Sequence, residues 1–185
     1  MSVKAIASLV LSMSLLVGLF LISSLIDKTS SSTQDEFFRI HIRANSNDTI
    51  DQNVKYEVKD KIVKFLTPYL CEAEDKASAM QIVNNMLPSI ESLANDVLAQ
   101  NGLTYTSSGV LYRETFPMRV YGDVVLPAGE YDSLIINLGS GKGNNWWCVV
   151  YPPLCFVGDD NMSNVVYKSK LAEIINSFWR RMNAY

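Results

Sequence analysis

The stretch from Gly139 to Phe156, GSGKGNNWWCVVYPPLCF, constrains the fold more than any other part of the sequence. Three glycines in its first five residues permit positive backbone φ angles and close approach to another surface. Trp146–Tyr151 then carries large apolar or aromatic side chains on both faces of an extended segment. Such a strand is either buried on both sides or forms a contact surface. Pro152 and Pro153 end the strand and set an extended path for the chain that follows.

Residues Ala5 to Ile26 form an apolar segment of the length that a membrane span requires. Its 22 residues carry no charge, and about 20 such residues cross a bilayer as a helix. Lys4 precedes the segment, whereas the charges of residues 27 and 28 cancel behind it, so the positive-inside rule places residues 27–185 outside the cytoplasm. A cleaved signal peptide is the competing interpretation. We therefore expect a signal peptide or membrane anchor over residues 1–28 and a flexible stalk over residues 29–36.

Composition excludes several classes of function. About 150 residues remain after the N-terminal segment, enough for one domain with a core. The formal net charge of −3 gives no basic footprint for nucleic acid. The single histidine, His41, excludes sites that need two imidazoles, and the three cysteines lack the paired spacing of a structural zinc site. We expect no metal, no small-molecule cofactor and no nucleic-acid partner.

Residues Phe37 to Arg43 alternate between apolar and polar side chains. Phe38, Ile40 and Ile42 share one face of an extended segment, and the opposite face carries Arg39, His41 and Arg43. This pattern predicts a half-buried strand. Its polar face is interpreted either as a solvated surface or as a cationic docking strip.

The rest of the domain reads as four helices and several strands. Apolar residues recur every four positions from Ile50 to Leu66 and predict an amphipathic helix ending near Pro68. From Leu103 the period changes to two, which predicts strands, and the loop 139–145 is expected to join two of them as an antiparallel hairpin. The fold class is therefore α+β over residues 37–185, with a mostly antiparallel sheet packed by about four helices. The helices are expected near residues 50–68, 75–86, 88–100 and 164–182.

Candidate catalytic groups in the sequence are weak. The glycine loop resembles a phosphate-binding loop but lacks the GxxxxGK[ST] pattern and the following helix, so it is either a flexible connector or a partner contact. His41 is a candidate base for Cys148 or a serine, but no pattern brings these side chains together. A carboxylate pair for glycan hydrolysis would come from acidic residues near turns, which are commonplace. These acidic residues are Glu114, Asp123, Glu130 and Asp132.

Several short motifs together resemble the stage II sporulation protein R family. The resemblance covers most of residues 37–157, and its most specific parts are the WWC and PPLCF stretches. Met118 and Val120 stand where the family pattern leads us to expect threonines. The motifs are Arg39-Ile40-His41, Ala44-Asn45-Ser46, Phe116-Pro117 with Arg119, Tyr121-Gly122-Asp123, Leu126–Tyr131, Gly141-Lys142-Gly143, Asn145–Val149 and Pro152–Phe156.

The resemblance implies an exported or membrane-anchored signalling domain made in the forespore of endospore-forming bacteria. In the space between forespore and mother cell, such a domain would activate a membrane-embedded aspartic-type protease that matures pro-sigma-E in the mother cell. The family offers no established catalytic residues, so we expect a protein that acts by contact and is not an enzyme. The competing hypotheses are an extracytoplasmic cell-wall hydrolase and a glycan-binding domain.

The residues expected to contact the partner lie in the motifs quoted above. They are Gly141, Lys142, Gly143, Asn145, Trp146, Trp147, Arg119, Tyr121, Asp123, Arg39 and His41. Cys148 and Cys155 are expected to form a disulfide, because export places them where disulfides persist and the proline pair turns the chain back. Two buried thiols are the alternative. Cys71 is expected to be a small apolar residue near the end of a helix.

Overall fold

The computed structural model describes residues 33–121, 124–156 and 165–182. The chain divides into a unit from Met1 to Thr33 and a unit from Gln34 to Tyr185, and the fold given below is that of the second unit. The expected anchor lies outside the described residues. Thr33–Glu36, assigned to the stalk from sequence, forms a short 3-10 helix, η1. Within the described ranges, no helix combines the length and the apolar character needed to cross a bilayer.

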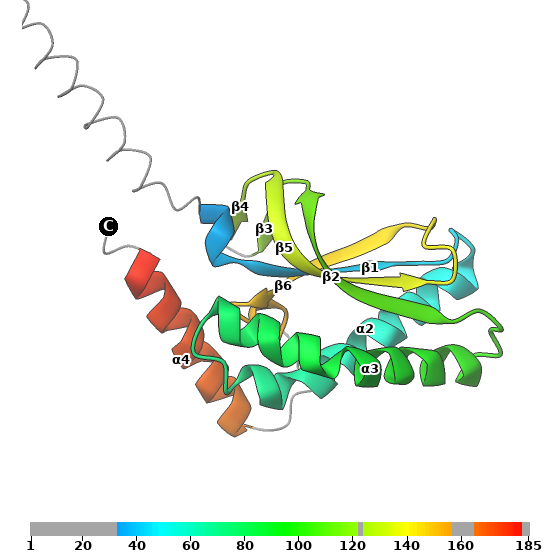
Figure 1. The fold of residues 1–185 in the computed structure, drawn as a ribbon, viewed down its shortest axis with the longest axis horizontal. Coiled ribbons are helices and arrows are strands. Elements are labelled where there is room, and N and C mark those ends of the chain that lie inside the picture. Colours follow the sequence, from blue (N-terminus) through cyan, green and yellow to red (C-terminus); the bar gives the residue numbers. More distant parts are fainter. Residues whose placement is uncertain (1–32, 122–123, 157–164, 183–185) are drawn as a thin grey trace, which may run out of the picture. The chain divides into compact units, whose positions relative to one another are not determined.

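A four-stranded sheet in the order β2-β5-β1-β6 forms the framework of the domain (Figure 1). The inner strand β1 (Phe38–Arg43) runs parallel to β5 (Gly129–Leu138) and antiparallel to β6 (Asn145–Tyr151). β2 (Ser107–Phe116) pairs antiparallel with β5. The domain is therefore α+β with a mostly antiparallel sheet, as the sequence predicts.

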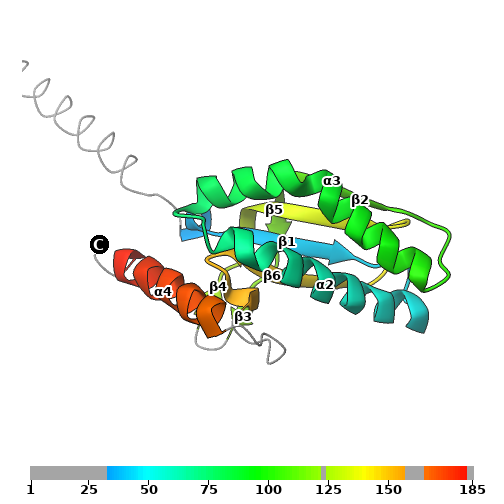
Figure 2. The same cartoon turned by 90° about the horizontal axis from the view of Figure 1, so that it is seen from below.

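Three α-helices pack with this sheet in the part of the chain that the structure describes. α2 (Thr49–Leu70) and α3 (Lys76–Gln100) lie side by side across one face of the sheet (Figures 1 and 2). α4 (Val165–Met182) packs through Phe178, whose ring centroid lies 5.3 Å from that of Phe37. The 3-10 helix η2 (Leu154–Phe156) follows β6.

The hydrophobic core lies between the sheet and the two long helices. Ile40 and Ile42 of β1 are buried in it, and removal of such side chains from water is the main force that holds the layers together. The helices contribute a continuous set of buried side chains. These are Val54, Val58, Ile62, Leu66, Val83, Ile90, Ala94, Val97 and Leu98.

The second and third helices expected from sequence are one helix. Pro88 lies inside α3 and does not begin a new helix. A proline removes one backbone hydrogen bond, here to the carbonyl of Asn84 one turn earlier. Asn84 and Pro88 are both exposed, so water can satisfy that carbonyl, while Val83 and Ile90 stay buried on one stripe. Burial of the stripe therefore outweighs the local cost of the proline.

The predicted hairpin between β5 and β6 is wrong. β1 lies between these strands and pairs with both of them. The connecting loop consequently crosses the end of β1 and does not form a tight turn. β1 thus takes an inner position in the sheet, where both of its edges are hydrogen-bonded.

The prediction that β1 is half-buried is also wrong. Arg39 is 0% exposed and His41 is 1% exposed, so the polar face of β1 is covered as well. A two-stranded ribbon, β3 (Arg119–Tyr121) with β4 (Val124–Leu126), lies in the connection between β2 and β5, and Tyr121 reaches Arg39. The polar face of β1 is therefore neither a solvated surface nor a cationic docking strip.

Candidate functional site

The glycine loop, residues 139–144, is fastened to the segment that follows β1. The amide of Gly143 donates to the carbonyl oxygen of Ala44 at 2.8 Å. The amide of Ser140 donates to Asn45 Oδ1 at 2.9 Å, and the Ser140 hydroxyl donates to the Asn45 carbonyl oxygen at 2.7 Å. The loop is therefore held in place by its neighbours, unlike a flexible connector.

Backbone geometry makes glycine necessary in this loop. A β-carbon on Gly143 would lie 2.1 Å from the backbone carbonyl oxygen of Ser46, which is far inside van der Waals contact. Gly141 has a φ of +63°, in the left-handed region that other residues avoid. Lys142, between the two, is exposed. The arrangement presents one cationic side chain on a loop with a fixed backbone.

A partly buried polar network supports the loop. Asn45 Nδ2 donates to Asp51 Oδ2 at 2.8 Å, and the Tyr105 hydroxyl donates to Asp51 Oδ1 at 2.5 Å. Burial by itself raises the pKa of Asp51, but hydrogen bonds from Tyr105, Ser46 and Asn45 outweigh burial and leave that pKa below its ordinary value. Burial and the Asp51 carboxylate raise the pKa of Tyr105. Asp51 therefore stays charged and fixes the orientation of Asn45.

Lys55 connects α2 to the same loop. Its ammonium group donates to Gln52 Oε1 at 2.7 Å and to the carbonyl oxygen of Asn144 at 3.0 Å. The backbone amide of Asn144 in turn donates to Asn47 Oδ1 at 2.7 Å. Lys55 is 1% exposed, and burial lowers its pKa. The helix, the segment after β1 and the glycine loop are thus joined by named hydrogen bonds.

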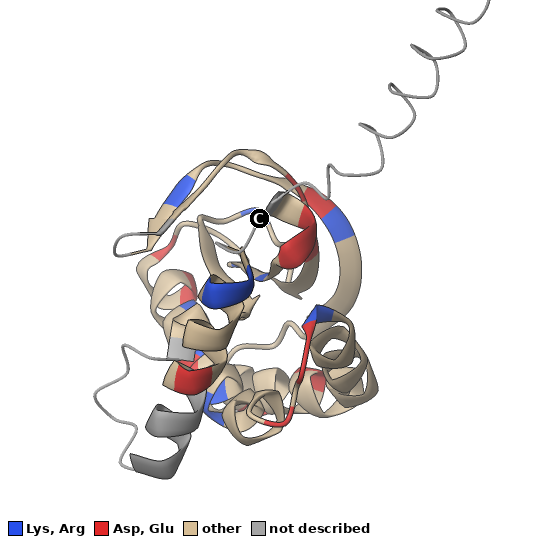
Figure 3. Ribbon diagram, turned by 90° about the vertical axis from the view of Figure 1, so that its left-hand side faces the viewer, with Lys and Arg blue, Asp and Glu red and all other residues tan. Residues whose placement is uncertain are grey.

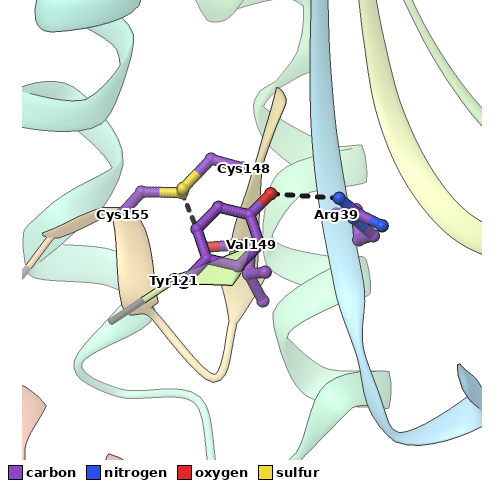
Figure 4. Close-up of a disulfide and its surroundings, with 5 residues drawn as sticks. All are labelled: Arg39, Tyr121, Cys148, Val149 and Cys155. Atoms are coloured by element: carbon purple, nitrogen blue, oxygen red, sulfur yellow. Dashed lines mark hydrogen bonds between the residues drawn. A yellow bond between two sulfur atoms is a disulfide. The ribbon is translucent and has the colours of Figure 1, made fainter. Parts of the chain in front are cut away.

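A second cluster lies on the opposite face of the sheet, around Arg39. Its guanidinium carbon lies 4.1 Å from the ring centroid of Phe116 and 4.7 Å from that of Tyr131. Arg39 Nη2 donates to the Tyr121 hydroxyl at 3.0 Å (Figure 4). Burial lowers the pKa of Arg39, and the electron-rich faces of the rings compensate part of the lost hydration. The guanidinium thus fastens the β3–β4 ribbon to the sheet.

His41 occupies the adjacent position on this face. Its ring stacks on Trp147 with centroids 3.5 Å apart, and its Nδ1 lies 3.0 Å from Glu114 Oε2. Arg43 also donates to the Glu114 carboxylate. Burial lowers the pKa of His41 and outweighs the opposing effect of Glu114. His41 is therefore neutral near pH 7 and donates its Nδ1 hydrogen to Glu114.

The structure joins Cys148 and Cys155 by a disulfide, with Cα atoms 5.9 Å apart (Figure 4). Cys148 lies opposite Ile40 in the β1–β6 register, so it is on the helix-covered face, away from His41. The Cys148–His41 catalytic pair considered from the sequence is thereby excluded. Cys71 is buried at the C-terminal end of α2.

The candidate carboxylates interact with other residues and do not form a pair with one another. Glu114 binds His41 and Arg43 as described, and Glu130 accepts from the Thr115 hydroxyl at 2.6 Å. Asp132 pairs with Lys76 at 2.5 Å. Asp123 lies outside the described residues. Each of the three described carboxylates thus has its own partner.

The residues expected at the partner surface do not lie together in the structure. Gly141, Lys142 and Gly143 lie in the loop that Asn45 orients, whereas the half-buried Tyr121 and Trp147 pack on the buried Arg39 and His41. Asn145 and Arg119 are exposed. Trp146 lies on the other face of β6, with Lys59 Nζ 5.8 Å from its ring centroid.

Sequence reasoning missed the support beneath the loop. Asn45 stood out in the sequence only as part of the Ala44-Asn45-Ser46 motif, and no pattern gave Asp51 or Lys55 a role. The available signal was their spacing: two charged residues four positions apart lie on the same side of a helix, beside its apolar stripe. Charged residues that are buried and hydrogen-bonded there fix local geometry.

Comparison with known proteins gives one consistent result. The profile of the family described as stage II sporulation protein R matches residues 34–161. Stage II sporulation protein R of Bacillus subtilis (strain 168) is 35% identical over 127 residues, which cover 69% of this chain and 57% of the relative. The chain thus spans less than two thirds of that relative's length. No solved structure matches the chain.

Proposed function

The chain belongs to the stage II sporulation protein R family, and we propose that it is the forespore signal that activates a membrane-embedded aspartic-type protease. That protease then matures pro-sigma-E in the mother cell. The observation that carries the proposal is the match over residues 34–161, which contains both the glycine loop and the disulfide. In this proposal the domain acts outside the cytoplasm, between forespore and mother cell, either anchored or secreted.

The geometry supports action by contact. Lys142 projects from a loop whose backbone is fixed by Ala44, Asn45 and Ser46, so its position is set before a partner arrives. Preorganisation of this kind reduces the entropy lost on binding. Figure 3, a ribbon seen from the left-hand side of Figure 1, shows Lys and Arg residues interspersed with Asp and Glu residues along the chain. We assign Lys142 and the exposed Asn145 to the contact surface.

The buried members of the predicted set have a different role in this proposal. Arg39 and His41 hold Tyr121 and Trp147 in place and do not themselves reach a partner. Their function is to position the ribbon and the start of β6 relative to the glycine loop. A partner surface assembled from the glycine loop and the start of β6 requires that these two segments be fixed to one another.

Co-expression in a non-sporulating host tests the proposed function. The full chain is produced together with the candidate protease and pro-sigma-E, and cleavage of pro-sigma-E is scored by immunoblot. We expect cleavage in the presence of the chain and only background cleavage with the protease by itself. A folded and exported chain that leaves pro-sigma-E uncleaved would contradict the proposal. Cleavage in a strain that lacks the protease would instead point to a proteolytic activity of the chain.

A further inference from the structure

The β3–β4 ribbon carries an unusual group of exposed aliphatic side chains. Val120 and Val125 are directly opposite each other in the ribbon and are 61% and 58% exposed. Met118, which precedes β3, is 60% exposed. Single exposed aliphatic residues are common on protein surfaces, but a contiguous group of them marks a contact with a protein or a membrane.

The ribbon is held firmly, so this exposure is not a consequence of loose packing. Its other face is fixed by the hydrogen bond between the Tyr121 hydroxyl and Arg39, and by Leu126, which is 1% exposed. Alternation along a strand then forces Val120 and Val125 to point away from the sheet. The backbone of the ribbon therefore directs the side chains of Val120 and Val125 outward.

The ribbon also lies beside the point where the N-terminal segment joins the domain. Gln34 Nε2 donates to the carbonyl oxygen of Ala128 at 3.3 Å, just after β4. Gln34 also packs on Gly129, where an added β-carbon would lie 2.3 Å from its Nε2. Figure 1 shows η1, in blue, at the same end of the sheet as β3 and β4. Gln34, where the preceding chain is attached, is therefore close to the ribbon.

Chain length limits how far the end of the apolar segment lies from Gln34. The apolar, uncharged segment ends at Ile26, and seven residues, 27–33, separate it from Gln34. Seven fully extended residues span at most about 25 Å. Ile50, an equally apolar residue that is 51% exposed, instead follows the opposite end of β1 at the start of α2. Among the described residues, the ribbon is thus an exposed apolar group close to Gln34, the residue to which the segment expected in lipid is connected.

We propose that Met118, Val120 and Val125 insert into the interfacial layer of the membrane in which residues 5–26 are anchored. Aliphatic side chains leave water for the boundary between headgroups and acyl chains, and the exposed Arg119 between two of them can meet lipid phosphates. Three side chains bind lipid weakly by themselves, but the anchor raises their effective concentration at the membrane. This inference rests on the membrane location included in the proposed function. It adds a second contact that fixes the orientation of the domain above the bilayer.

Lipid quenching of a fluorescent label tests the inference. The full chain with Val120→Cys is labelled with a nitrobenzoxadiazole maleimide under non-reducing conditions and reconstituted into vesicles of phosphatidylethanolamine and phosphatidylglycerol. The matched control is Ile50→Cys, and the unsubstituted protein gives the labelling background from native cysteines. Quenching is measured with lipids that carry a nitroxide on the acyl chain and, separately, with aqueous iodide.

We expect lipid quenching at position 120 several-fold stronger than at position 50, and iodide quenching in the reverse order. Equal iodide quenching at both positions, without lipid quenching, would overturn the inference while leaving the anchored location intact. Protection of position 120 that appears only when the protease is co-reconstituted would also overturn it and assign the ribbon to a protein contact. Failure of the chain to remain with the vesicles would reject both the ribbon contact and the anchored form of the proposed function.

Discussion

At the scale of single residues, Gly143 carries the tightest steric requirement in the glycine loop. We expect Gly143→Ala to lower the free energy of unfolding by about 3 kcal/mol, near the upper end of the range for overpacking, because the new β-carbon meets the Ser46 carbonyl oxygen. Gly102→Ala is the control. Gly102 has a φ of +73° but nothing within 4 Å of an added β-carbon, so it should cost only about 1–2 kcal/mol of backbone strain. Urea unfolding measures both. A loss at Gly143 smaller than the loss at Gly102 would show that the clash relaxes at little cost.

His41 provides a residue-scale prediction about pH. Its pKa in the folded state is lowered, so between its unfolded pKa, about 6.5, and the folded value the unfolded chain binds more protons. Stability should therefore be fully present above about pH 7 and fall as pH decreases through 6.5, with a slope of at most about 1.4 kcal/mol per pH unit. The decrease in stability ends at pH values below the pKa of His41 in the folded state.

The control for this prediction is His41→Gln, which removes the titrating group and keeps a polar side chain next to Glu114. Its unfolding free energy, measured by urea between pH 7.5 and about 5.5, should be nearly independent of pH, whatever its absolute value. Asp51 titrates in a separate, more acidic window, because its pKa is lowered from a value near 4. An unchanged slope in the variant would show that another group causes the pH dependence.

At the scale of elements, the disulfide connects β6 to η2. Cys155 Sγ also lies 2.8 Å from the carbonyl oxygen of Val149, so η2 covers the outer edge of β6 at this point. Closing a loop of this length stabilises a fold by roughly 2–3 kcal/mol through the unfolded state. We expect Cys155→Ser to lose about that amount relative to the oxidised protein. Addition of a reductant should remove the difference between the two.

Mass spectrometry after alkylation checks the bridge directly. In exported protein that has not been reduced, Cys148 and Cys155 should resist alkylation and appear as a linked peptide pair. Alkylation of both residues without reduction would rule out the bridge in the cell. The stability comparison would then report the packing of two thiols.

Local periodicity predicted the elements better than their partners. The helical repeat of α2 and the alternation of β1 and β5 were visible in sequence because each depends on residues a few positions apart. The proline in α3 was misread because its cost is local, whereas the gain from burying Val83 and Ile90 on one stripe is tertiary. The insertion of β1 between β5 and β6 brings together residues about 95 positions apart, such as Ile42 and Ile136. No local signal records such a pairing.

At the scale of the whole molecule, the candidate site illustrates the same limit. The loop and its lysine were visible in the sequence as a motif. The support beneath the loop was not, because Asn45 and Ser140 meet across 95 positions. The polar face of β1 was misread for the same reason, since the residue that covers Arg39 is Tyr121, 82 positions away. Among the residues that the sequence proposes for partner contact, the structure shows which are exposed, such as Lys142, and which are buried, such as Arg39.

Lys142 carries the prediction that concerns the function of the molecule as a whole. The loop backbone is fixed by glycine geometry and by Asn45, so truncation of an exposed side chain at position 142 removes a charge without disturbing the fold. We expect Lys142→Ala to leave the melting temperature within about 1 °C of the parent, since exposed substitutions change stability little. The rate of pro-sigma-E cleavage in the co-expression assay should fall about tenfold, the effect of losing a contact that contributes about 1.4 kcal/mol.

The matched control is Lys64→Ala, which removes an exposed lysine from the middle of α2, away from the loop. It should leave both the melting temperature and the cleavage rate unchanged. Equal cleavage by the two variants and the parent would show that Lys142 does not contact the partner, and the glycine loop would then serve to join β5 to β6 across the end of β1. A loss of cleavage in both variants would indicate that net charge, and not the position of Lys142, determines the interaction. Loss in Lys142→Ala together with retention in Lys64→Ala requires a contact at this loop, because the two substitutions remove the same charge from the same fold.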